Sequence, residues 1–129
     1  MTRYTEQHAK SGLKAKLPTL ACFPNQYPGY EITLEDPEFT SVCPKTGLPD
    51  FGILTICYMP NKWCVELKSF KYYINGYRDV GIFQENAVNR ILADFVKAVK
   101  PKWAVAVGKF NARGGIQTTV EARYPKRQS

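Results

Sequence analysis

Two side chains in one short segment, Cys43 and Asp50, have the types and spacing that could perform chemistry. They stand in SVCPKTGLPDFG, whose prolines and glycines indicate an ordered loop. A thiol is a strong nucleophile even when only a few per cent of it is thiolate, but it needs a nearby group that moves protons. The single histidine, His8, is remote in the sequence, so Asp50 is the nearest candidate, and a partly desolvated aspartate can act as an acid near neutral pH. Spacing alone leaves Cys43 as either a catalytic nucleophile or a structural cysteine.

A second polar pair, Gln84 and Glu85, lies at the start of the clearest predicted helix, about Ile82 to Lys100, which Pro101 closes. The apolar residues of this helix fall in one arc of the helical wheel, namely Val88, Ile91, Leu92, Phe95, Val96 and Val99. Gln84 and Glu85 fall inside that arc, so both are expected to point toward the buried side. An inward carboxylate is costly unless it is paired. Glu85 is therefore either a carboxylate that interacts with the helix N-terminus or a ligand-binding group.

The strands that must position these groups are predicted from alternating or continuous apolar runs. Four such runs are Tyr30–Leu34, Ile53–Met59, Trp103–Phe110 and Ile116–Tyr124. The last two are joined by NARGG, which is typical of a β-hairpin. This order predicts an α+β fold with a mostly antiparallel sheet and helix on one face.

One further segment, which begins at Trp63, changes its pattern partway. Its apolar side chains first alternate at Trp63, Val65 and Leu67 and then shift to the opposite parity, at Phe70, Tyr72 and Ile74. A strand with a bulge or bend near Ser69 would explain this shift, and bulges often lie beside functional sites.

The formal net charge of +7, from 18 Lys and Arg against 11 Asp and Glu, suggests a nucleic-acid partner at first sight. The excess lies at the two ends of the chain, and residues 17–122 are nearly neutral. We therefore expect one domain over residues 1–129, with basic tails at 1–20 and 125–129. Charge runs of this kind are more often solubilising ends than specific nucleic-acid contacts.

The four cysteines, Cys22, Cys43, Cys57 and Cys64, form no CxxC pair and have no histidine near them, which argues against structural zinc, and we expect no metal. Cys57 and Cys64 lie in apolar runs and are expected to be small core residues. No apolar run is long enough to cross a bilayer, and the first residues lack the apolar core of a signal peptide. A cytoplasmic protein with reduced cysteines is the expectation.

Four segments together resemble one known family. They are the loop SVCPKTGLPDFG, the segment VELKSFKYY, the Gln84–Glu85 pair and the turn NARGG. They are similar to the nitrile reductases of queuosine biosynthesis, the NADPH-dependent 7-cyano-7-deazaguanine reductases of the short, single-domain type. The similarity runs from about Phe23 to Tyr124. Its most specific element is the cofactor signature of that family, which residues 66–73 satisfy at all eight places.

The resemblance implies a reaction and a role for each candidate residue. Cys43 would add to the nitrile carbon of 7-cyano-7-deazaguanine to form a covalent thioimide, Asp50 would be the general acid, and two NADPH would supply hydride to give 7-aminomethyl-7-deazaguanine. Glu85 would read the guanine-like base. Other substrate-binding residues would be Val65, Glu66, Leu67 and Gln84. The NADPH phosphates would be bound by Lys68, Lys71 and Arg113.

The resemblance also implies the tunnelling fold (T-fold), in which the sheets of several subunits close into an oligomeric ring with sites between subunits. One departure from the family concerns Gln84, which stands where many members have a histidine. A glutamine side chain can hydrogen-bond substrate, but it cannot change its charge near neutral pH. Either Asp50 or water would then carry any proton transfer that histidine assists in relatives.

Two other functions are compatible with parts of this pattern. A tRNA-acting amidine (archaeosine) synthase of the same family would keep Cys43 and Asp50 but has no use for NADPH, so the intact Lys68 and Lys71 signature favours the reductase. A non-catalytic basic module would bind nucleic acid through the tails. Its RNA binding would depend strongly on salt and would not need Cys43.

Overall fold

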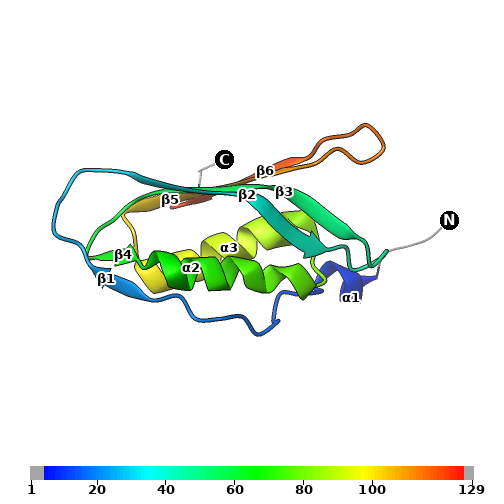
Figure 1. Cartoon of the computed structure of the whole chain (residues 1–129), viewed down its shortest axis with the longest axis horizontal. Coiled ribbons are helices and arrows are strands. Elements are labelled where there is room, and N and C mark those ends of the chain that lie inside the picture. Colours follow the sequence, from blue (N-terminus) through cyan, green and yellow to red (C-terminus); the bar gives the residue numbers. More distant parts are fainter. Residues whose placement is uncertain (1–4, 127–129) are drawn as a thin grey trace.

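A four-stranded antiparallel sheet forms one layer of the molecule and two helices form the other (Figure 1). The computed structural model describes residues 5–126, and the statements below concern that part of the chain. The sheet has the order β2-β3-β5-β6, with strands β2 (Ile32–Val42), β3 (Pro49–Met59), β5 (Trp103–Phe110) and β6 (Thr119–Tyr124). The helices on its face are α2 (Leu67–Asn75) and α3 (Gln84–Val99). The predicted α+β class, antiparallel pairing and helices on one face are confirmed.

Shorter elements complete the chain. Strands β1 (Cys22–Pro24) and β4 (Trp63–Val65) form a two-stranded sheet at one end of the helices, the 3-10 helix η1 (Gly76–Asp79) follows α2, and α1 (Glu6–Ala9) lies at the other end (Figure 1). No helix of the described part is both long enough and apolar enough to span a membrane.

The core lies between the sheet and the two helices. Alternate side chains of β3 point into it, and the rings of Tyr58 on β3 and Phe95 on α3 meet edge to face at 4.8 Å between centroids. Cys64 is buried, as expected of a small core residue. Cys57 is only half-buried because it has the opposite parity on β3, which faces away from the helices.

The segment after β4 is a helix, so the prediction of a bent strand near Ser69 was wrong. The carboxylate of Glu66 accepts hydrogen bonds from the backbone N–H groups of Lys68 (3.0 Å) and Ser69 (2.7 Å), which makes Glu66 the N-cap of α2. The buried residues Phe70, Tyr73 and Ile74 have the spacing of one helical face. The change of parity in the sequence marks the junction of a short strand with a helix.

The described part of the expected N-terminal tail lies against the helical layer. The Ser11 hydroxyl donates to the carbonyl oxygen of Gly81 (2.7 Å), and the Asn86 side chain donates to that of Ala9 (2.7 Å). Leu17 and Leu20 pack against the core. These contacts place the segment beside the start of α3.

Candidate active site

The loop between β2 and β3 holds Cys43 in a tight turn. The Cys43 N–H donates to the carbonyl of Leu48, and the Gly47 N–H donates to the carbonyl of Cys43, both at 2.9 Å. Gly47 has φ +72°, a left-handed conformation that glycine adopts without strain. The thiol is buried, with 7% of the residue exposed. Burial raises the pKa of the Cys43 thiol, but hydrogen bonds from Thr46 and from the backbone of Lys45 outweigh it, so the pKa is lowered overall.

Asp50 is the second residue of β3, so it lies on a rigid strand and not in the loop that the sequence predicted. It pairs in register with Ser41, two positions before Cys43, and only 4% of it is exposed. Burial raises the pKa of the Asp50 carboxyl, Arg113 and a hydrogen bond from Gln84 oppose this rise, and Glu85 adds to it. The net effect is a raised pKa. The negative charge of Asp50 disfavours ionisation of the Cys43 thiol and so opposes the net lowering of its pKa.

The start of α3 is fastened beside this loop by backbone hydrogen bonds. The Val42 N–H donates to the carbonyl of Val80 (3.0 Å), and the Ile82 N–H donates to the carbonyl of Val42 (2.9 Å). The first residue of α3, Gln84, is half-buried and hydrogen-bonds Asp50. The chain therefore brings the first turn of α3 to the cysteine loop, although the two are about forty residues apart.

Glu85 is exposed, so the prediction that it points to the buried side was wrong. One helical turn later, Asn89 is also exposed, which places Glu85 at the margin of the apolar arc. Its side chain lines a surface hollow with Ala9, Phe83 and Asn86. A carboxylate in this position is accessible to a ligand that approaches the cysteine loop.

Arg113 reaches the site from the turn between β5 and β6. Reciprocal backbone hydrogen bonds join Arg113 and Ile116, and the two glycines between them have φ of +58° and +83°, which favours glycine at both positions. The turn is fastened to β3 by the Asn111 N–H, which donates to the carbonyl of Phe51 (2.8 Å). Arg113 Nη1 lies 2.6 Å from Asp50 Oδ1. The sequence singled out Arg113 but did not predict this pairing.

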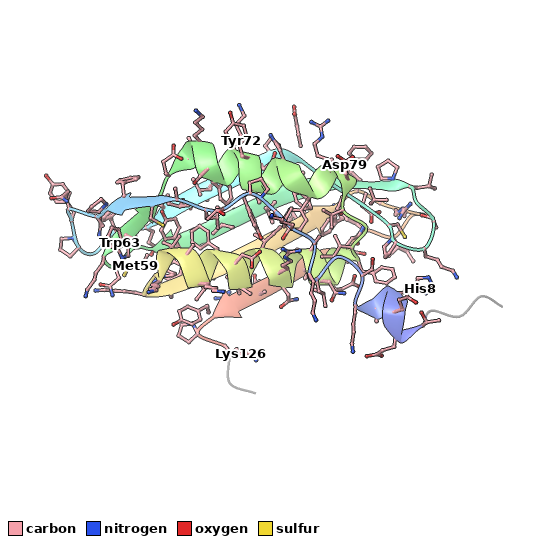
Figure 2. All side chains as sticks on the ribbon, turned by 90° about the horizontal axis from the view of Figure 1, so that it is seen from below. His8, Met59, Trp63, Tyr72, Asp79 and Lys126 are labelled. Carbon is pink, nitrogen blue, oxygen red and sulfur yellow. The ribbon has the colours of Figure 1, made fainter. Side chains whose placement is uncertain are left out.

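The remaining predicted residues lie at the other end of the molecule. The Val65 N–H donates to the hydroxyl of Tyr58 (3.1 Å), and Tyr58 is eight residues along β3 from Asp50, a distance of roughly 27 Å in a strand. In Figure 2, Met59 and Trp63 mark this end and Asp79 marks the end nearer to the cysteine loop. Glu66 is engaged as a helix cap, and Leu67 is 65% exposed. One chain therefore brings together Cys43, Asp50, Gln84, Glu85 and Arg113 and separates them from Val65, Glu66 and Leu67.

Lys68 and Lys71 stand three residues apart on α2, so they project from neighbouring positions on one side of a helix. The Lys68 ammonium lies 5.9 Å from the centre of the Tyr72 ring. Lys71 lines a hollow of about 550 Å³ between α2 and β2, together with Arg78. A helix, and not a strand bend, therefore allows both lysines to serve one ligand.

Comparison with known proteins gives one family. The model of the family described as QueF-like protein matches residues 49–129. A protein of Elusimicrobium minutum (strain Pei191), named NADPH-dependent 7-cyano-7-deazaguanine reductase, is 58% identical over 125 residues, which cover 96% of this chain and 95% of that protein. A protein of the same name from Chloroherpeton thalassium (strain ATCC 35110 / GB-78) is 61% identical over 107 residues, which cover 81% of this chain and 92% of that protein.

Among solved structures, the apo form of the archaeosine synthase QueF-Like superposes with a TM-score of 0.70. The match covers 76% of this chain and 95% of the other, at 23% sequence identity. At this identity the likeness establishes a shared fold only.

Proposed function

Because the chain belongs to the family of QueF-like proteins, we infer that it is an NADPH-dependent 7-cyano-7-deazaguanine reductase. It is an oxidoreductase that uses NADPH as a co-substrate to convert a nitrile into an aminomethyl group in queuosine biosynthesis. The observation that carries this conclusion is the 58% identity to a reductase over 96% of the chain. The archaeosine synthase alternative has weaker support, since the neighbour of that name is only 23% identical.

The thiol of Cys43 is proposed to be the nucleophile. It is buried, its pKa is lowered by hydrogen bonds within its own turn, and it lies near one carboxyl group, that of Asp50. Addition of the thiol to the nitrile carbon forms a C–S bond, and the thiol proton passes to the nitrile nitrogen. The product is a bent C=N group that can accept hydride, which a linear nitrile does poorly. We assign the transfer of that proton to Asp50.

Base recognition is assigned to the first turn of α3. The carboxylate of Glu85 can accept two hydrogen bonds from the amide and amino edge of a guanine-like ring. Gln84 hydrogen-bonds Asp50 in the free protein. The Gln84 side chain would therefore contact both the substrate and the proposed acid. The exposure of Glu85 supports this role because an unburied carboxylate is available to ligand.

The cofactor is assigned to Lys68, Lys71 and Arg113, whose cations suit phosphate groups. When bound, NADPH would supply the hydride for each of the two reductions. The two lysines share a side of α2. Arg113 lies with Asp50 at the other end of β3, so the three cations do not converge within one chain.

This separation supports a site shared between subunits. Val65, Glu66 and Leu67 lie at the end of β3 opposite to Asp50, so they can border the substrate only if they come from a neighbouring copy. Strands β2 and β6 are the edges of the described sheet, and pairing of such edges between copies would close a ring of the tunnelling-fold type. We therefore propose a homo-oligomer with active sites at its interfaces.

The test mixes the protein with 7-cyano-7-deazaguanine and follows the absorbance of NADPH. Consumption of two NADPH per nitrile is expected, together with a Cys43 adduct in a mass spectrum recorded without NADPH. The Cys43→Ala variant should show neither, and Cys57→Ala, which alters a half-buried cysteine of the opposite sheet face, should behave as the original protein. A stable adduct with no NADPH consumption would favour the amidine synthase. RNA binding without either reaction would favour the basic binding module.

A further inference from the structure

The ion pair between Arg113 and Asp50 lies at the centre of the candidate site and joins residues 63 positions apart. The distance from Nη1 to Oδ1 is 2.6 Å. Only 3% of the Asp50 side chain is exposed, whereas 46% of the Arg113 side chain is. A buried carboxylate is thus held by a cation that enters from the solvent side.

The charged and titratable groups around Asp50 come from three elements. Arg113 belongs to the β5–β6 turn, Glu85 to the first turn of α3, and Cys43 to the loop before β3. Among the described residues whose charge acts on Asp50, Arg113 is the one cation. Because solvent screens charges weakly in a buried site, removal of this cation would favour the neutral carboxylic acid.

We propose that Arg113 is a positioning residue for the reaction, since its ion pair holds Asp50 in place and ionised, ready to accept the Cys43 proton. This proposal rests on the proposed function, because it concerns the addition of the thiol to the nitrile. In that step the S–H bond breaks, a C–S bond forms, and Asp50 transfers the proton to the nitrile nitrogen. Electrons and protons balance without NADPH, and Asp50 ends as it began, ionised and paired.

Positioning of Asp50 and binding of the NADPH phosphates would act at different steps of the reaction. A residue that only binds NADPH cannot affect a step that proceeds without NADPH. A residue that acts on Asp50 affects thioimide formation itself. Adduct formation in the absence of cofactor therefore separates the two roles.

The experiment measures the rate of attachment of 7-cyano-7-deazaguanine to Cys43 by mass spectrometry, without NADPH, across a range of pH. We expect Arg113→Gln to slow attachment about tenfold at neutral pH. This is smaller than the full rate enhancement that proton transfer by a positioned group contributes. The acidic limb of its pH profile should move to higher pH, because Asp50 without its cation ionises only at higher pH. Arg113→Lys should restore much of the rate.

Two control variants bracket this result. Arg123→Gln removes an arginine of similar exposure that is paired with Glu121 on β6, and it should match the original protein. Lys97→Gln removes an exposed lysine in the last turn of α3, outside the proposed sites, and should also leave cofactor-free attachment unchanged. If Arg113→Gln does not fold, the pH profile of Arg113→Lys tests the proposal instead. Lysine is a cation of different shape, so it should still move the acidic limb to higher pH, but by less than the shift expected for glutamine.

Two results would overturn the proposal. One is an Arg113→Gln variant that forms the adduct with the original rate and pH profile and has only a raised KM for NADPH. The other is a loss of rate that is equal at all pH values and is not restored by lysine, which would indicate a merely structural role. If the original protein forms no adduct and consumes no NADPH, the proposed function fails as well, so the two failures are distinguishable.

Discussion

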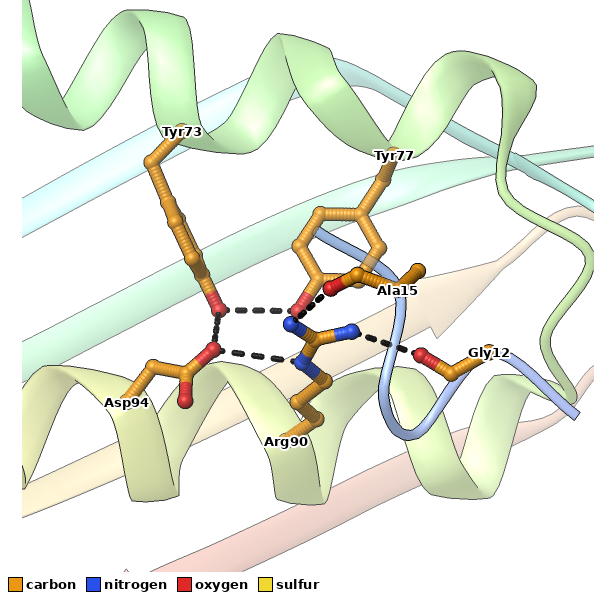
Figure 3. A network of polar contacts seen from close by, with 6 residues as sticks. All are labelled: Gly12, Ala15, Tyr73, Tyr77, Arg90 and Asp94. Atoms are coloured by element: carbon orange, nitrogen blue, oxygen red, sulfur yellow. Dashed lines mark hydrogen bonds and ion pairs between the residues drawn. The ribbon is translucent and has the colours of Figure 1, made fainter. Parts of the chain in front are cut away.

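The guanidinium of Arg90, in the middle of α3, donates a 2.6 Å hydrogen bond to the backbone carbonyl of Gly12 in the N-terminal segment (Figure 3). The same side chain donates to the carbonyl of Ala15 and pairs with Asp94 (3.3 Å). Asp94 also accepts from the hydroxyl of Tyr73, which lies on α2. One arginine therefore joins the two helices and the N-terminal segment through a part-buried network.

The first prediction is that Arg90→Ala loses about 2–4 kcal/mol of unfolding free energy. The change leaves two carbonyls and a carboxylate without their cationic donor in a site where the Arg90 side chain is only 14% exposed. Urea denaturation measures the loss. The matched control is Arg123→Ala, an exposed arginine paired with Glu121, which should lose less than about 1 kcal/mol. Equal losses in the two variants would contradict the importance of the network.

The second prediction concerns Gly12, the residue whose carbonyl Arg90 binds. Gly12 has φ +80°, and a Cβ built there would lie 2.6 Å from the carbonyl oxygen of Gly81 and 2.6 Å from the Cβ of Ile82. We expect Gly12→Ala to destabilise the fold by about 2 kcal/mol or more, because backbone strain and overpacking add. Gly81 and Ile82 lie just before Phe83, the N-cap of α3, so the variant should also slow the formation of the Cys43 adduct.

The control for Gly12 is Gly29→Ala. Gly29 has a similar φ of +73°, but nothing lies within 4 Å of its Cβ position. This variant should show only the cost of the left-handed conformation, about 1 kcal/mol, and an unchanged rate of adduct formation. Chemical denaturation and the adduct assay compare the two variants. If they behaved alike, the contact between the N-terminal segment and residues 81–82 would have no energetic importance.

The third prediction concerns the cap of α2. Hydrogen bonds from the backbone N–H groups of Ser69 and Lys68 lower the pKa of Glu66 below its ordinary value of 4.5. Its folded pKa is therefore below the unfolded one, so this stabilisation is present above about pH 4.5 and is lost as the pH falls through the folded pKa. Glu66→Gln should be less stable than the original protein near neutral pH, and the difference should shrink in acid. A difference that stays constant in thermal unfolding down to acid pH would argue against the cap.

Glu66 begins α2, a helix that the sequence pattern did not predict. The helix α3 and the β5–β6 hairpin were predictable because long apolar periods and a glycine-rich turn specify them locally. The helix α2 was missed because a three-residue strand runs directly into it, and nine residues give few turns for a period to emerge. The N-cap acid followed by Phe70, Tyr73 and Ile74 was the signal available.

The residues of the candidate site also divide into those that local sequence predicts and those that depend on tertiary structure. Cys43 and Asp50 were found because they share one loop sequence, and Gln84 because it begins a recognisable helix. The pairing of Arg113 with Asp50 depends on the register between β3 and β5, in which Gly52 lies opposite Phe110. Register is a tertiary property that no local pattern contains. The helical wheel placed Glu85 on the buried side of α3, although it is exposed. A wheel does not show where along a helix the packing against the rest of the protein ends.

The last prediction concerns Gln84, which hydrogen-bonds Asp50 and favours its ionised form. Gln84→Leu should raise the pKa of Asp50 further above its ordinary value. The variant removes a hydrogen bond that lowers this pKa, while the burial that raises it remains. Since the proposed relay needs ionised Asp50, the acidic limb of adduct formation should move to higher pH. Gln84→His should instead introduce a new limb near about pH 6.5, where an imidazole titrates. The control Gln26→Leu alters an exposed glutamine near β1 and should leave the profile unchanged. Profiles that coincide for the original protein and Gln84→Leu would mean that Gln84 has no influence on the acid, and recognition of the base would be its remaining role.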